Sequence, residues 1–282
     1  MNEGEAAPAS VAGQNSRNLL ARVAAAMVLA PLAIAIAYAG GWLWTALVTL
    51  AAIGLYLEWL TIAGAARERR VVAVGVVSLS AAGLCLAAGR IEAAFTVLAI
   101  GFLAVAAIAQ ARRGWTAGGF LYAAAAQTAS ILLRLDSRNG FVALVFILLV
   151  VWVTDIGGYF AGRGIGGPKL WPRVSPKKTW AGAIGGFAGS LVVAAGFVAL
   201  DFGKAGWLVL LGAMLSIVAQ LGDLFESAVK RRFGVKDSSH IIPGHGGLLD
   251  RLDGFVAAIV LAAILGVVRG GMDGAGRGLM VW

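Results

Sequence analysis

Long apolar stretches alternate with short polar segments along this chain, a pattern that predicts helices crossing a membrane. A membrane-spanning helix needs about 20 predominantly apolar residues, and about nine segments come near that length. They lie at approximately residues 19–39, 41–60, 71–88, 92–110, 116–134, 140–160, 181–201, 205–229 and 253–270. The segment at 116–134 is the weakest, because it contains Gln127 and ends in Arg134. We therefore expect an all-α, polytopic integral membrane protein with about nine transmembrane helices.

Lys and Arg are distributed unevenly between the two sets of loops. With a cytoplasmic N-terminus and nine alternating spans, most of the 23 basic residues fall on the cytoplasmic side. Cytoplasmic loops carry an excess of Lys and Arg, so this bias predicts a cytoplasmic N-terminus. It also explains the net charge of +9 without a nucleic-acid partner.

The composition agrees with lipid as the solvent. Charged residues make up 13% of the chain, against about 25% in soluble proteins, and the mean hydropathy is +0.87. Forty glycines would let membrane helices approach closely. The single cysteine, Cys85, excludes a disulfide framework and a cysteine-based zinc site.

The pattern divides the chain into three parts. Residues 1–18 are expected to form a disordered cytoplasmic tail, and the apolar stretch behind them is too long for a signal-peptide core, so we interpret it as a retained helix. Residues 19–139 form the N-terminal transmembrane helices. Residues 140–282 form a catalytic transmembrane region with two long cytoplasmic loops, 161–180 and 230–252. Long ordered loops tend to be functional.

The first loop region begins with an acid inside the sixth predicted helix. A carboxylate at membrane depth, here Asp155, normally faces a cavity or a partner. The alternative is that Asp155 lies at the membrane–water interface and is only hydrated there. Gly162, Gly164 and Gly167 fit the dinucleotide pattern G-x-G-x-x-G. That pattern is meaningful only between a strand and a helix, so we discount it here.

The stretch SPKKT, residues 175–179, leads into the seventh predicted helix. A helix N-terminus attracts anions, Lys177 and Lys178 add positive charge, and Ser175 and Thr179 add hydroxyl donors. Together these groups suit a phosphate. Taken alone, an ordinary basic flank with Ser175 as the N-cap would explain the stretch better.

The second loop is flanked by charged helix ends. Asp223, Glu226 and Lys230 share one face of the eighth predicted helix, which suits a hard cation and the phosphates it carries. The alternative is a local ion pair between Glu226 and Lys230, which accounts poorly for Asp223.

At the start of the ninth predicted helix, His245 lies among glycines, and Asp250 and Asp253 follow. Stabilisation of acids by the helix dipole, about 0.3–1 kcal/mol each, explains neither the histidine nor the Arg between the acids. Two histidines are too few for a typical zinc site. Oxygen ligation suits Mg²⁺ better, with phosphates completing its shell.

Acids and phosphate-seeking cations thus gather at one membrane face, which favours metal-assisted phosphoryl or nucleotidyl transfer. The rival function is a cation or proton transporter that uses Asp155, Asp223 and Glu226 as a relay. A transporter would place its acids through the depth of the membrane.

The run SAVKRRFGVKDSSHIIPGHGGLLDRLD, residues 227–253, resembles the signature of the phosphatidate cytidylyltransferases, also called CDP-diacylglycerol synthases. The stretch from Thr154 to Thr179 resembles that family too, and the motif-level likeness covers about residues 153–253. It implies that CTP and phosphatidate give CDP-diacylglycerol and pyrophosphate, with Mg²⁺ and, in some members, K⁺. It also implies a multi-pass protein of the bacterial inner membrane that forms a homodimer.

The resemblance also implies residue roles. The expected metal acids are Asp223 and Asp250, with Asp253 and Asp155 nearby, and Lys230 and His245 join the first two as catalytic candidates. The expected phosphate contacts are Ser175, Lys177, Lys178, Thr179, Arg231 and Lys236. Because phosphatidate is largely deprotonated near neutral pH, His245 is expected to shape the turn or donate to a phosphate.

Two positions depart from the family pattern. Ala181 stands where a polar residue is usual, and Gly254 where a small hydroxyl residue is common. The sequence leaves open the acyl-chain preference and a sister enzyme that activates another lipid phosphate.

Overall fold

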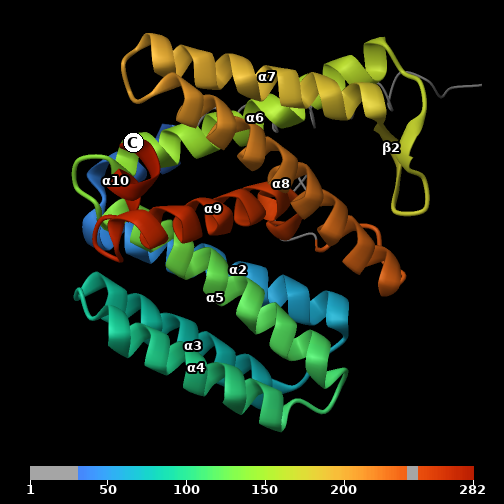
Figure 1. Cartoon of the computed structure of the whole chain (residues 1–282). Helices are drawn as coiled ribbons and strands as arrows, with labels where there is room; N and C mark the ends of the chain where they lie inside the picture. The colour runs from blue at the N-terminus through green and yellow to red at the C-terminus, as the bar shows by residue number, and fades with distance from the viewer. Residues whose placement is uncertain (1–30, 240–246) are drawn as a thin grey trace, which may run out of the picture.

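The computed structural model describes residues 31–239 and 247–282, and the all-α expectation is confirmed there. Eight helices in these ranges are long and apolar enough to cross a membrane. They are α2 (Gly41–Ala63), α3 (Arg69–Ala87), α4 (Ile91–Ile108), α5 (Arg113–Leu135), α6 (Gly140–Gly164), α7 (Trp180–Ala199), α8 (Ala205–Arg232) and α9 (Leu249–Gly270). Each corresponds to a predicted span (Figure 1).

The first predicted span, 19–39, is described only in part, and residues 31–39 are helical. The predicted tail at 1–18 lies outside the described residues. The total of nine spans and the cytoplasmic N-terminus therefore stay predictions.

The structure differs from expectation in three short segments. The loop at 161–180 contains an antiparallel hairpin of β1 (Lys169–Trp171) and β2 (Ser175–Thr179). Helix α9 begins at Leu249, several residues before the predicted start at 253. A short helix, α10 (Ala275–Met280), follows α9 and packs against it. These segments are too short or too polar for a count of apolar residues to find them.

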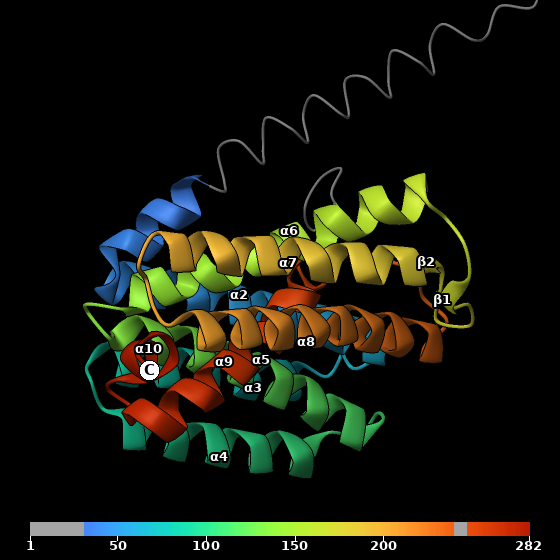
Figure 2. The ribbon, with the colours of Figure 1, turned by 45° about the horizontal axis from the view of Figure 1, so that its top comes forward.

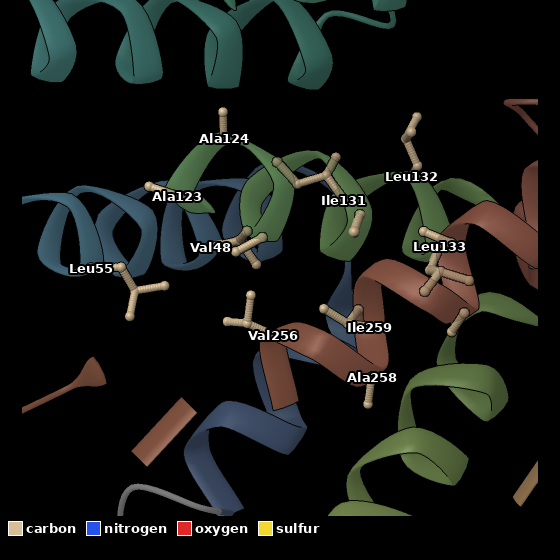
Figure 3. Close-up of a cluster of buried hydrophobic side chains, with 14 of the residues drawn as sticks. Val48, Leu55, Ala123, Ala124, Ile131, Leu132, Leu133, Val256, Ala258 and Ile259 are labelled. Atoms are coloured by element: carbon tan, nitrogen blue, oxygen red, sulfur yellow. The ribbon is translucent and has the colours of Figure 1, made fainter. Parts of the chain in front are cut away.

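Helix α5 lies inside the bundle, between α2 and α9, while α3 and α4 form an outer hairpin (Figures 1 and 2). Apolar side chains of α2, α5 and α9 meet in the core, among them Val48, Ile131 and Ile259 (Figure 3). This position explains the low hydropathy of α5, because its Gln127 side chain is fully buried in protein and does not face lipid. The Gln127 side chain donates to Thr49 Oγ1 and to the Leu79 carbonyl oxygen, each at 2.9 Å.

Glycines allow α6 and α7 to pack closely. A Cβ atom on Gly182 would lie 2.8 Å from the carbonyl oxygen of Gly158, and one on Gly157 would lie 3.0 Å from that of Gly185. Gly162 packs against Thr179 and Gly182, whereas Gly164 and Gly167 face open space. The glycines between α6 and α7 therefore serve helix packing, which agrees with rejecting the dinucleotide pattern.

Contacts between helix ends place the end of α2 beside the start of α5, and the start of α7 beside the last turns of α8. Trp59, near the end of α2, donates its indole N–H to the carbonyl oxygen of Trp115, at the start of α5, over 2.8 Å. Lys178, just before α7, forms an ion pair with Asp223, near the end of α8. The first predicted functional loop and the described residues of the second therefore lie at one end of the bundle.

Candidate active site

A cavity of about 650 Å³ opens between α6, α7, α8 and the β-hairpin. Five of the predicted site residues line it, from separate segments of the chain: Asp155, Lys177, Lys178, Thr179 and Asp223. Thr154, Tyr159, Arg163, Leu170 and Gln220 also line it. Acids and cations distant in the sequence thus line one cavity.

The β-hairpin and a helix cap hold the cationic side of this cavity. Strand β2 pairs with β1 through Lys169 opposite Thr179 and Trp171 opposite Ser175. The Thr179 side chain then caps α7 by accepting the Gly182 amide N–H at 3.1 Å. The expectation of Ser175 as the cap was wrong, because Ser175 pairs in the strand four residues before Thr179.

The acidic side is assembled from α6, α8 and α9. Asp155 and Asp223 line the cavity, and Asp253 interacts electrostatically with both of them and with Lys178. Glycines bring α8 and α9 together here. A Cβ on Gly222 would lie 2.8 Å from the Asp253 carbonyl oxygen, and one on Gly254 would lie 3.1 Å from that of Ala219. This tight crossing explains why a small residue occupies position 254.

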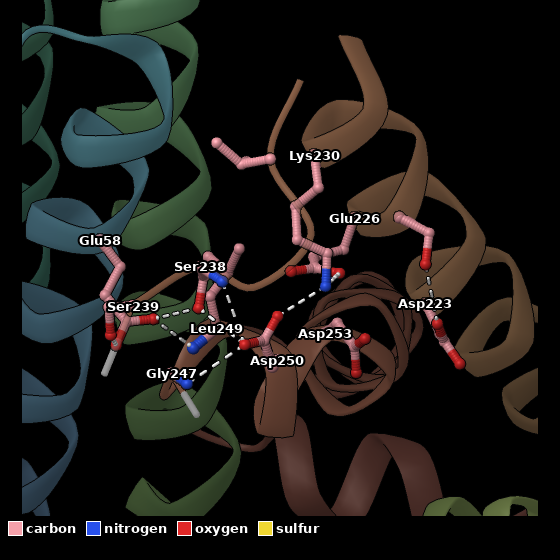
Figure 4. Close-up of polar contacts among 12 residues, drawn as sticks. Glu58, Asp223, Glu226, Lys230, Ser238, Ser239, Gly247, Leu249, Asp250 and Asp253 are labelled. Atoms are coloured by element: carbon pink, nitrogen blue, oxygen red, sulfur yellow. Dashed lines mark hydrogen bonds and ion pairs between the residues drawn. The ribbon is translucent and has the colours of Figure 1, made fainter. Parts of the chain in front are cut away.

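Asp250 belongs to a neighbouring cluster, where it contacts Lys230, Ser238 and Gly247 (Figure 4). It accepts a bond from Lys230 Nζ at 2.5 Å, and the amides of Ser238 and Gly247 each donate to it at 3.1 Å. Lys230 also pairs with Glu226 at 2.6 Å, so the local ion pair weighed from the sequence does form. Protein donors therefore already occupy both carboxylate oxygens of Asp250.

Three further residues predicted for the site are not among the residues that line the cavity: Arg231, Lys236 and, outside the described residues, His245. The Arg231 guanidinium donates to the carbonyl oxygen of Val235 in its own loop, at 3.1 Å, and Lys236 is exposed. His245 lies outside the described residues. Roles for these three residues stay predictions.

The cavity residues that were not predicted as site residues include Tyr159, Arg163 and Gln220. Arg163 donates to the Tyr159 hydroxyl at 2.8 Å, which holds the guanidinium at the cavity. Gln220 lies one turn before Asp223 on α8. Helical spacing was the available signal, because Asp155, Tyr159 and Arg163 follow one another at intervals of four residues on α6.

The oxygen ligands at this cavity suit Mg²⁺ if the substrate completes the shell. Asp155 and Asp223 are hard carboxylate ligands, and the Asp223 side chain is 31% exposed. Among the described residues, no group of three or more His, Cys, Asp or Glu side chains is arranged to hold a metal alone. Mg²⁺ is commonly bound through one or two carboxylates plus substrate phosphates, which fits this arrangement.

Comparison with known proteins points to the same chemistry. The model of the cytidylyltransferase family matches residues 20–268. The phosphatidate cytidylyltransferases of Brucella suis and Brucella melitensis are each 40% identical over 258 residues, which cover 89% of this chain and 94% of theirs. The phosphatidate cytidylyltransferase of Staphylococcus saprophyticus is 51% identical over 124 residues, covering 43% of this chain and 48% of that relative.

Proposed function

Because this chain belongs to the cytidylyltransferase family, we propose that the cavity between α6, α7 and α8 is its active site. The chain transfers the cytidylyl group of CTP to phosphatidate, giving CDP-diacylglycerol and pyrophosphate. The observation that carries the site assignment is the meeting of Asp155, Asp223, Lys177 and Lys178 around one cavity.

The position of the cavity fits two substrates of opposite solubility. Phosphatidate stays in the bilayer, and CTP stays in water. A site at the ends of the membrane helices, which we assign to the cytoplasmic side from the distribution of Lys and Arg, is within reach of both. An oxygen of the phosphatidate phosphate attacks the α-phosphorus of CTP, the bond to the β-phosphate oxygen breaks, and pyrophosphate leaves.

The residues of the cavity bind and orient these groups. Lys177, Lys178 and Arg163 face the space where the phosphates would lie, and their charge offsets the negative charge of the triphosphate. Lys178 is held by its ion pair with Asp223, so its position is fixed before substrate arrives. Phosphatidate needs no strong base, since its phosphate is already deprotonated.

We propose Asp223 and Asp155 as the residues that hold Mg²⁺, with Asp253 adding a nearby negative charge that would attract the cation. Bound Mg²⁺ would supply charge stabilisation to the transferring phosphate. Asp250, which was also predicted as a metal ligand, is better suited to holding Lys230, because Lys230 occupies its Oδ1 and the amides of Ser238 and Gly247 occupy its Oδ2. K⁺ is proposed only from the family resemblance.

The transporter alternative fits the described residues less well. Asp155, Asp223, Glu226 and Asp253 all lie near one end of the bundle. In the described part of the chain, the buried polar side chains farther along the helices, such as Gln127, Ser190 and Ser216, are neutral. A relay of ionisable groups through the membrane is therefore not formed by these residues.

Purified protein supplied with phosphatidate, radiolabelled CTP and Mg²⁺ tests the proposal. We expect a lipid-soluble cytidine product, and parallel reactions with ATP, dCTP and other lipid phosphates would identify a sister enzyme. Absence of any labelled lipid would refute the assignment.

The chain is a multi-pass membrane protein related to bacterial enzymes. We propose the inner membrane as its location and a homodimer as its assembly, both from the family resemblance. Crosslinking in native membranes would test the dimer, and a monomer at all protein densities would contradict it.

A further inference from the structure

A buried carboxylate lies in α2, far along the chain from the residues discussed so far. The Glu58 side chain is fully buried, with 0% of the residue exposed. A charged group at membrane depth is costly unless it is fully paired. The hydrogen-bond donors that pair with Glu58 come from the segment between α8 and α9 and from the first residue of α9.

Four donors converge on the Glu58 carboxylate (Figure 4). Oε1 accepts the Ser239 hydroxyl at 2.6 Å and the Leu248 amide at 2.8 Å. Oε2 accepts the Ser238 hydroxyl at 2.9 Å and the Leu249 amide at 2.7 Å. Hydrogen bonds to an ionised acceptor are among the strongest in proteins, so Glu58 fastens Ser238, Ser239 and the start of α9 to α2.

Glu58 also performs the task of a helix cap. Leu248 is the N-cap residue of α9 and has no capping side chain of its own. The first amides of a helix need acceptors, and an anion there gains from the helix dipole. Glu58, which lies in α2, supplies both the acceptor oxygens and the negative charge to the start of α9. Gly247 makes room for it, since a Cβ there would lie 2.6 Å from Glu58 Oε2.

The same segment leads directly to the charged cluster beside the cavity. The Ser238 hydroxyl that contacts Glu58 lies 3.1 Å from Asp250 Oδ2. Asp250 binds Lys230, and Lys230 binds Glu226 on α8. A continuous chain of polar contacts therefore runs from α2 to α8 through Ser238 and Asp250.

We propose that Glu58 is a positioning residue for the transfer reaction: it fixes the start of α9 and Ser238, and through them the placement of Asp250 and Lys230. This inference rests on the proposed function. It gives the N-terminal helices a part in the transfer reaction that acts through the start of α9, although the motif-level likeness to the family covers only about residues 153–253.

Glu58→Gln provides the sharpest test. The substitution keeps the shape of the side chain but replaces one acceptor oxygen with an NH₂ donor, which must face a backbone N–H and a hydroxyl. Glu68→Gln is the matched control. Glu68 accepts the amides of Gln110 and Ala111 at 2.9 and 2.8 Å, but these lie in the α4–α5 turn, outside the polar chain to Asp250.

We expect kcat per folded protein to fall at least tenfold in Glu58→Gln and to stay within twofold of wild type in Glu68→Gln. Glu58→Asp, which keeps both acceptor oxygens, should recover part of the loss. Combining Glu58→Gln with Ser238→Ala should cost no more than the larger single change, because both act through one contact. If Glu58→Gln does not fold, Glu58→Asp and Ser238→Ala provide the comparison.

Amide hydrogen exchange at Leu248 and Leu249 adds a readout that needs no turnover, and exchange there should be faster in Glu58→Gln but not in Glu68→Gln. Two results would overturn the inference: a kcat in Glu58→Gln equal to that of Glu68→Gln, or fully additive losses with Ser238→Ala. If wild type gives no cytidine lipid, the proposed function fails instead, and exchange still reports whether Glu58 holds α9.

Discussion

Replacing Gly182 with alanine changes the packing of α7 against α6, which forms one wall of the cavity, without changing any charged residue. It therefore tests whether this packing matters for turnover. Its new Cβ would lie 2.8 Å from the Gly158 carbonyl oxygen and 3.3 Å from Thr179 Oγ1. The first distance is about 0.6 Å short of ordinary contact, so α7 must move away from α6. Overpacking costs about 1–3 kcal/mol, and the better helix propensity of alanine offsets about 0.5–1 kcal/mol of it.

The displacement carries Thr179 and Lys178 with the start of α7. A misplacement of about 1 Å can cost a hundredfold in rate, so we expect kcat to fall on the order of tenfold. Gly196→Ala is the matched control, because Gly196 lies on the same helix and a Cβ added there would have no atom within 4 Å. Activity per folded protein in detergent or nanodiscs is the assay. Equal activity of the two variants would refute the reasoning.

Two substitutions test single contacts, and removal of divalent cations tests the metal proposal. Thr179→Val removes the acceptor for the Gly182 amide and should lower stability by about 1 kcal/mol, seen as a lower thermal midpoint; an unchanged midpoint would argue against the cap. Lys178→Met should raise KM for CTP roughly tenfold to a hundredfold, since a charge-assisted hydrogen bond contributes about 1.5–3 kcal/mol, whereas an unaltered KM would remove Lys178 from the phosphate site. Chelation of divalent cations should abolish turnover and Mg²⁺ should restore it; full activity in chelator would exclude the metal proposal.

The helices were predictable because the lipid solvent imposes a length of apolar sequence on each span. Even α5 was found, although Gln127 and Arg134 lower its hydropathy. The hairpin was not found, because strands of three and five residues carry too few alternations to show a period. Its formation places Ser175 in a strand and makes Thr179 the cap.

The site was predictable as a set of residue types near one membrane face, but the contacts within it were not. Sequence spacing put Asp250 and Asp253 on the same helix start and could not tell which would interact with Asp223. The early start of α9 and its crossing with α8 at Gly222 decide that Asp253 does. Glu58 is a lone acid in an apolar helix, which is itself a signal, but its partners lie about 180–190 residues away.

The most direct test of the central claim is the formation of labelled lipid by Asp223→Asn beside Asp201→Asn. Asp201 lies in the exposed turn between α7 and α8 with a φ of 60°, which asparagine adopts readily, so this control should match wild type. Asp223→Asn should fold normally and give no lipid-soluble cytidine product from radiolabelled CTP and phosphatidate. Wild-type turnover in folded Asp223→Asn would contradict the account.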